Sequence, residues 1–212
     1  MAQQFDDSVR SDKINYQNSR ERSDMQWVRL FLALLLFNGV AVAAPRSIDA
    51  ANSTIIVRVY KAGVFSALGH DHEIAAPIAS GKVEDSTRTV ELRVDSAALK
   101  VRDEHVSDKD RTEIQNTMLG PEVLDSEHYP QITFRSKSAD PLGENAWTLH
   151  GDLMIHGQTH PLDVEVREAG GHYRGTASIR QTDFGIKPVK IAGGAVRVKD
   201  EIRVEFDIQL AH

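Results

Sequence analysis

Alternating apolar and polar residues between positions 145 and 166 form the clearest structural signal in this chain. Apolar residues or glycine recur at every second position there, which is the pattern of a strand with one buried face. This parity contains Trp147, Leu149, Gly151, Leu153 and Ile155, followed by Leu162, Val164 and Val166. In the centre, Gly157 within His156-Gly157-Gln158-Thr159 can adopt the positive φ of a tight turn. The stretch therefore predicts a β-hairpin with one apolar and one polar face.

Similar alternation predicts further strands through the rest of the chain. They are expected at residues 53–61, 65–74, 78–84, 90–95, 131–136, 173–180, 195–199 and 201–210. Residues 85–88 (Asp-Ser-Thr-Arg) predict the turn of a hairpin between the third and the fourth of these strands. Asp200 separates the last two segments and predicts another tight turn.

The period changes to that of a helix between residues 103 and 124. Ser107 is a typical N-cap, and Asp108 and Asp110 place negative charge in the first turn, where the helix dipole favours it. Ile114, Met118 and Leu119 share one face of a 3.6-residue repeat. The pair Gly120-Pro121 predicts the end of the helix. The acidic and basic residues that precede it, at 103–105, are expected to form a solvated loop.

These elements predict an all-β fold of about eight strands with one short helix. The absence of strand–helix–strand alternation favours antiparallel pairing. Strands with one apolar face can be buried in a sandwich or in a closed barrel. A barrel removes exposed sheet edges, but periodicity alone leaves both architectures open.

The first 43 residues are expected to lie outside the folded domain. Residues 27–29 (Trp-Val-Arg) give a short positive lead, residues 30–42 form an apolar run, and small residues follow at 41–44, the pattern of a secretory signal. A helix of that run is about 20 Å long against a bilayer core of about 30 Å. A cleaved signal peptide at 25–43 is therefore favoured over an uncleaved anchor.

Residues 1–24 are polar and unpatterned. They are interpreted as a disordered tail, or as a mis-assigned start if translation begins at Met25. Residues 44–212 then form a single domain, with no membrane span after cleavage of the signal. We expect this domain to be periplasmic or secreted.

Charge and cysteine content exclude several classes of function. Residues 1–43 contain five basic and five acidic residues, so residues 44–212 keep the net charge of -6. That charge argues against nucleic acid or an anionic membrane surface as a partner. The chain has no cysteine, which excludes disulfides, thiolate chemistry and lipidation at an N-terminal cysteine.

Four sequence motifs occur in an order that resembles the YceI-like family of exported lipocalin-like proteins. They are Leu119 to Asp125, Tyr129-Pro130 with Ile132, Phe134 and Ser136, the hairpin centre 151–162, and Asp183-Phe184-Gly185-Ile186. The resemblance covers residues 53–210. It implies an eight-stranded antiparallel, lipocalin-like barrel whose lumen holds an apolar isoprenoid-like lipid, either a polyisoprenoid or an isoprenoid quinone.

Inward-facing apolar residues are the candidate ligand-binding residues on this interpretation. The set is Val57, Val59, Phe65, Val94, Met118, Phe134, Leu149, Leu153, Phe184, Ile186 and Phe206. A barrel of about eight strands is just wide enough to be filled by its own side chains or to hold one ligand. The alternative interpretation is therefore that these residues form a packed core, in a filled barrel that acts as an interaction module.

A histidine-based site is the remaining alternative. His70 and His72 would share one face of a strand and are weak candidates for metal ligands, although two imidazoles are too few for a structural zinc site. No Gly-x-Ser-x-Gly nucleophile motif or phosphate-binding loop is present. We therefore expect no cofactor and no enzymatic activity, with a metal-dependent hydrolase as the alternative. The oligomeric state is left open, a homodimer included.

Overall fold

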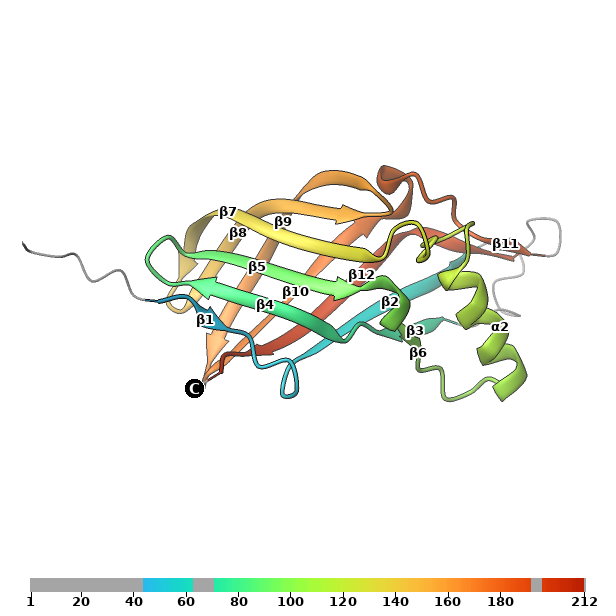
Figure 1. Cartoon of the computed structure of the whole chain (residues 1–212), viewed down its shortest axis with the longest axis horizontal. Helices are drawn as coiled ribbons and strands as arrows, with labels where there is room; N and C mark the ends of the chain where they lie inside the picture. Colours follow the sequence, from blue (N-terminus) through green and yellow to red (C-terminus); the bar gives the residue numbers. More distant parts are fainter. Residues whose placement is uncertain (1–43, 63–70, 192–195, 212) are drawn as a thin grey trace, which may run out of the picture. The chain divides into compact units, whose positions relative to one another are not determined.

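Eight antiparallel strands of at least seven residues form the wall of the domain (Figure 1). The computed structural model describes residues 44–62, 71–191 and 196–211. The long strands are β2 (Thr54–Ala62), β4 (Ile78–Glu84), β5 (Thr89–Asp95), β7 (Gln131–Gly143), β8 (Ala146–Ile155), β9 (Gln158–Ala169), β10 (His172–Arg180) and β12 (Val196–Gln209). Shorter strands are β1 (Arg46–Ser47), β3 (His72–Ala75), β6 (Lys100–Val101) and β11 (Lys190–Ile191).

The strands of the described residues belong to one continuous sheet, in the order β1-β4-β5-β7-β8-β9-β10-β12-β2-β3-β6, with β11 paired to β12. The sheet curls so that β1 lies between β4 and the end of β12. Arg46 pairs with Val83 of β4, and the next residue but one, Ile48, forms a bridge with Leu210. The Ala211 amide donates to the Ser47 carbonyl across the same seam, at 2.8 Å. The predicted antiparallel barrel of about eight strands is thus confirmed, and a two-sheet sandwich is not formed.

The β8–β9 hairpin forms as the sequence predicts. Strand β8 ends at Ile155 and β9 begins at Gln158, and these two residues pair. The two turn residues, His156 and Gly157, both have positive φ, 50° and 71°. Such a turn matches the right-handed twist of the strands that it joins. A Cβ at Gly157 would also lie 2.6 Å from the Tyr129 ring, so both backbone conformation and space require glycine there.

Residue Asp200 does not form the predicted tight turn. Strand β12 runs through it as one element, with an irregular register between Val198 and Ile202 where it pairs with β2. The Asp200 carboxylate instead accepts hydrogen bonds from the Thr182 amide, at 2.9 Å, and hydroxyl, at 2.7 Å. These bonds hold the 3₁₀ turn η3 (Gln181–Phe184) against β12. Asp200 is therefore a long-range hydrogen-bond acceptor and not a turn residue.

Strand lengths also differ from the prediction in two places. Strand β7 continues from residue 136 to Gly143, past a register irregularity between Ser136 and Ser138. Within the predicted strand 65–74, the described part is extended only from His72, as β3. Positions 65 and 70 lie outside the described residues.

One α-helix is present in the described part of the chain, α2 (Asp108–Leu119), and it lies at one end of the barrel (Figure 1). The Ser107 side chain accepts from the Asp110 amide at 3.1 Å, which confirms the predicted N-cap. Gln115 ties the helix to the barrel because its side chain accepts from the Val101 amide and donates to the Leu99 carbonyl. Met118 is consequently buried, in contact with the apolar core.

Candidate functional site

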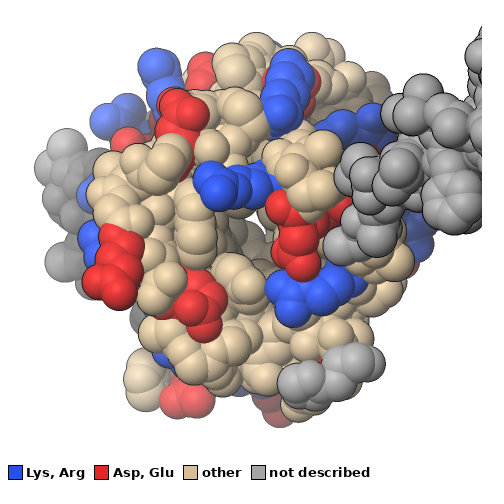
Figure 2. All heavy atoms as spheres, turned by 90° about the vertical axis from the view of Figure 1, so that its left-hand side faces the viewer, with Lys and Arg blue, Asp and Glu red and all other residues tan. Residues whose placement is uncertain are grey.

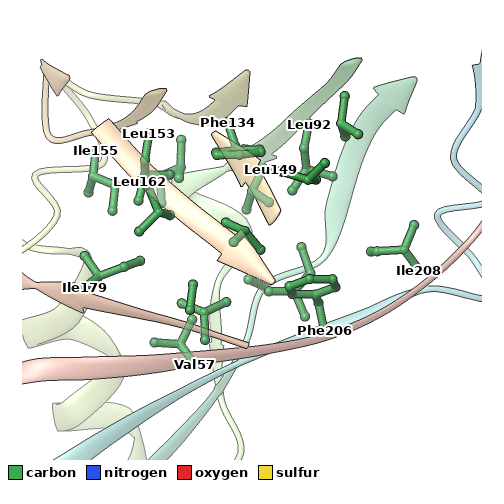
Figure 3. A pocket seen from close by; sticks show the side chains of 18 of the residues that line it. Val57, Leu92, Phe134, Leu149, Leu153, Ile155, Leu162, Ile179, Phe206 and Ile208 are labelled. Atoms are coloured by element: carbon green, nitrogen blue, oxygen red, sulfur yellow. The ribbon is translucent and has the colours of Figure 1, made fainter. Parts of the chain in front are cut away.

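The barrel encloses a cavity of about 440 Å³ whose wall is almost entirely apolar. Figure 3 shows Leu149 of β8 on one wall and, across the cavity from it, Val57 and Phe206 of the paired strands β2 and β12. This volume falls within the range of small-molecule binding sites, about 300–1,000 Å³. An apolar cavity of this size gives up apolar contacts unless a ligand fills it.

Ten of the eleven candidate residues from the sequence line this cavity. They are Val57, Val59, Val94, Met118, Phe134, Leu149, Leu153, Phe184, Ile186 and Phe206. The eleventh, Phe65, lies outside the described residues. Period-two alternation located the seven that lie on the inward parity of a strand. Met118 was located by the helical repeat of α2, whereas Phe184 and Ile186 belong to η3 and the residues after it and were located by the family resemblance.

Sequence reasoning missed many other lining residues, although most share the same parity. They include Ile55, Ile74, Leu92, Ile132, Leu162, Val164, Val166, Ile202, Val204 and Ile208. Two charged residues of the wall, Asp85 and Arg88, carried no such signal. They lie in the turn between β4 and β5, where sequence does not fix the direction of a side chain.

Burial divides the cavity wall into a packed end and an open end. The helix end is tightly packed: Val94 and Phe184 are each only 4% exposed, and Ile186 is 5% exposed. In contrast, Val57, Leu149 and Phe206 are only partly buried although they face the lumen. The packed-core interpretation therefore holds at the helix end. Toward the open end Val164, Val166 and Ala177 are also buried, but the side chains there leave a lumen that they do not fill.

The packed end is where three of the motifs that resemble a known family come together. The His156 ring lies against the Tyr129 ring, with 4.5 Å between centroids, and its Nδ1 is 3.3 Å from the Phe184 carbonyl oxygen. The His160 ring meets the Phe184 ring edge-on at 5.2 Å. Gly185 follows with a φ of 73° and lets the chain turn. These motifs close the barrel rather than line most of it.

Two glycines on the inward parity leave room for phenyl rings against the wall. A Cβ at Gly151 would lie 2.8 Å from the Phe134 ring, and a Cβ at Gly175 would lie 2.5 Å from the Phe206 ring. Each ring therefore rests directly on the backbone of a neighbouring strand. The lumen keeps its width because these rings lie along the wall.

The open end is formed by the turns β4–β5, β7–β8 and β9–β10. Figure 2 looks onto this end and shows a hollow bordered by basic and acidic side chains. Arg46 forms an ion pair with Asp85 at 3.0 Å and donates to the Tyr173 hydroxyl at 3.4 Å. These contacts, the bond to Tyr173 foremost, raise the pKa of Arg46. Asp85, Arg88 and Tyr173 all line the cavity.

His72 has a carboxylate partner rather than a metal-binding neighbourhood. Its Nδ1 lies 2.6 Å from Asp103 Oδ2, and the Glu73 amide donates to Asp103 Oδ1 at 2.8 Å. The expectation of a solvated loop is wrong for Asp103, whose side chain is 4% exposed, because these two donors compensate its burial. No group of three or more metal-ligating side chains occurs in the parts of the chain described, and His70 lies outside them.

The outer wall carries the charged residues of the strands in ion pairs. His150 contacts Asp163 at 2.7 Å and Asp140 at 3.2 Å, and the bond with Asp163 raises the pKa of His150. Arg174 and His172 both contact Asp207 at 2.7 Å. Polar groups thus face outward while the lumen remains apolar. In the described residues, no helix is long and apolar enough to cross a bilayer.

Comparison with known proteins yields one family and several relatives. The model of the YceI-like domain matches residues 47–210. A UPF0312 protein of Pseudomonas savastanoi pv. phaseolicola is 32% identical over 120 residues, 51% of this chain and 56% of its own length. The chain thus spans just over half the length of that relative. A UPF0312 protein of Shewanella putrefaciens is 23% identical over 168 residues, which cover 70% of this chain and 84% of its own.

A solved structure has the same fold. The crystal structure of Burkholderia cenocepacia BcnA matches 78% of this chain and 99% of its own, with a TM-score of 0.60 and 20% sequence identity.

Proposed function

This chain belongs to the YceI-like family, and from that premise we propose that it binds and carries an apolar isoprenoid-type lipid in its barrel. Family membership and the lipocalin-like fold support a binding protein rather than an enzyme. The ligand that we propose is a polyisoprenoid or an isoprenoid quinone, as the family resemblance implies.

The apolar, unfilled lumen is the observation that carries this proposal. Its wall contributes side chains from all eight long strands, and apolar residues dominate it. Removing hydrocarbon from water contributes roughly 25 cal/mol per Å² of buried area. A chain-like apolar ligand would also restore contacts that Val57, Leu149 and Phe206 lack in an empty lumen.

The mechanism that we propose is sequestration without chemistry. The lumen hides a hydrocarbon from water, the packed end limits how deeply it can enter, and the open end admits and releases it. No bond is made or broken, and no metal or cofactor is needed. We further propose that residues 25–43 direct export and are removed, so that the barrel acts in the periplasm or outside the cell.

A test of the proposal is native mass spectrometry of the protein purified from its own host, before and after exposure to isoprenoid quinones. The matched variants are Ala177→Trp, which fills the lumen from β10, and Ser178→Trp, which places the same ring on the outer face of that strand. We expect a lipid of about one equivalent on the native protein and on Ser178→Trp, and its loss from Ala177→Trp.

Two results would contradict the proposal. One is a barrel that stays empty after exposure to the lipids, and the other is equal loading of the two tryptophan variants. Circular dichroism of both variants verifies that each is folded. Sequencing the N-terminus of the same sample checks the proposed cleavage near residue 43.

A further inference from the structure

The charged groups that line the lumen are confined to its open end. Asp85 and Arg88 belong to the β4–β5 turn, and Tyr173 lies near the start of β10. Apart from the indole of Trp147, the remaining polar side chain of the wall is Gln181, at the packed end. Its Nε2 already donates to the Lys199 carbonyl at 2.8 Å. An amphiphile would therefore find its polar partners at the open end.

Arg88 is the charged lining residue whose charge is not compensated. Asp85 is paired with Arg46 at 3.0 Å, so these two charges cancel locally. Among the described residues, Arg88 forms no ion pair or hydrogen bond. Its guanidinium is thus available to a ligand, with five N–H donors suited to carboxylate or phosphate oxygens.

The backbone at Arg88 makes this placement more informative. Its φ is 53°, a left-handed conformation that residues other than glycine, asparagine and aspartate adopt infrequently. Glycine would relieve this strain in a hairpin turn. Arginine at this position instead places a cation at the opening, where the exposed Arg88 is one of the residues that line the lumen. The Tyr173 hydroxyl, which accepts from Arg46 at 3.4 Å, keeps its own proton to donate nearby.

We infer that the lumen selects amphiphiles with an anionic head group, bound tail first, with the head held at the open end by Arg88 and the Tyr173 hydroxyl. The shared chemistry is a carboxylate or a phosphate on a long hydrocarbon. This inference rests on the proposed carrier function and narrows its ligand to acidic lipids.

The test compares head groups on two matched tails. The full-length protein, freed of bound lipid, is titrated with dodecanoate and dodecanol and with farnesyl phosphate and farnesol. Binding is followed by tryptophan fluorescence, since Trp147 lines the cavity, and a Trp147→Phe variant identifies the signal of the other tryptophan, Trp27. We expect each acid to bind about ten-fold more tightly than its alcohol.

Three variants assign the effect to one side chain. Arg88→Gln should weaken both acids about ten-fold and leave both alcohols unchanged. Arg88→Lys should recover part of the loss. Arg167→Gln is the control. Arg167 is exposed and lies at the open end of the barrel on the outward parity of β9, and its substitution removes the same charge as Arg88→Gln. It should change no affinity by more than about two-fold.

Each outcome supports or overturns the inference. Tighter binding of farnesyl phosphate or of dodecanoate supports it and distinguishes an isoprenoid phosphate from a fatty acid as the source. If acids and alcohols bind equally, or if Arg88→Gln and Arg167→Gln have equal effects, the head-group site is refuted while the carrier function stands. If none of the four compounds binds, the carrier function itself fails.

Discussion

The two ends of the barrel are built from the same strands but differ in how fully their side chains fill the interior. At the helix end, Phe184 and Ile186 are 4% and 5% exposed, and α2 is fastened to the barrel by Gln115. At the other end, Leu149 and Phe206 face a lumen that side chains do not fill, and charged turns surround the opening. One end is buried like a protein core, whereas the other leaves a cavity between its side chains.

Apolar parity alone therefore does not distinguish a core residue from a residue of a ligand-binding wall. Leu149 and Leu153 lie on the same face of β8, four residues apart. Leu153 is 6% exposed and packed, whereas Leu149 is only partly buried. Position along the barrel does not distinguish them either, because Val164 pairs directly with Leu149 and is only 7% exposed. The environment of a residue depends on how the side chains of neighbouring strands pack against it.

The largest expected contrast comes from one substitution made at each end. Phe184→Ala should lower the free energy of unfolding by about 3–5 kcal/mol, because it leaves a hole in a packed region. Phe206→Ala should lower it by about 1–2 kcal/mol, because that ring is already partly exposed to the lumen. Urea unfolding of both variants measures the difference. Equal losses would show that the lumen is as well packed as the helix end.

Removing a carboxylate should also lower the free energy of unfolding more at the helix end than at the open end. Asp103→Ala should cost about 2–3 kcal/mol, since it leaves two partly buried donors, His72 Nδ1 and the Glu73 amide, without their acceptor. Asp85→Ala should cost less than about 1 kcal/mol, since Asp85 and Arg46 are about half exposed. Thermal and urea unfolding give both values. A large loss for Asp85→Ala would mean that the opening is part of the folding core.

The converse test enlarges a side chain at each end, which should be tolerated only where the lumen has space for it. Val94→Phe should cost about 1–3 kcal/mol, because the packed end has no room for the ring. Val204→Phe should cost less than about 1 kcal/mol, because the ring can enter the lumen. The same Val204→Phe protein should bind less lipid in the mass-spectrometric assay. A destabilised Val204→Phe variant with normal lipid content would contradict this expectation.

The smallest expected effect is the pH dependence of stability that comes from one carboxylate at each end, and it should have the same sign at both ends. Burial opposes ionisation of Asp200, but hydrogen bonds from Thr182 and Arg180 outweigh it and lower the pKa. The stabilisation is present above the unfolded-state value of about 3.9 and is lost as pH falls through the lower folded-state pKa. Asp200→Asn should therefore cost about 1 kcal/mol at pH 7 and progressively less below about pH 4.

Asp207, on the outer wall toward the opening, is the matched case. Burial opposes its ionisation too, and Arg174 and His172 together lower its pKa. Urea unfolding of Asp200→Asn and Asp207→Asn at pH 7 and pH 3 should show the same sign of pH dependence. Opposite signs would mean that the two ends differ in electrostatics as well as in packing.

Much of the fold could be predicted from sequence because its signals are local. Alternation in residues 145–166 reports the direction of each side chain, and Ser107 with Gly120 marks the limits of α2. Asp200 shows where this fails: the sequence suggested a turn, but a hydrogen bond to Thr182, distant along the chain, decides its role. Arg88 was missed for a related reason, because turn residues follow no parity.

The seam between β1 and β12 has a consequence for the time course of folding. Ile48 pairs with Leu210, so the first and last described segments of the domain must meet before the barrel is complete. Contacts between such distant parts of a chain form slowly, since the entropy of closing the loop is lost before the contact stabilises it. Neighbouring strands of the wall can pair one hairpin at a time, whereas the seam cannot form until the segment around Leu210 has been placed. We therefore expect the enclosed lumen to be the last feature of the domain to form.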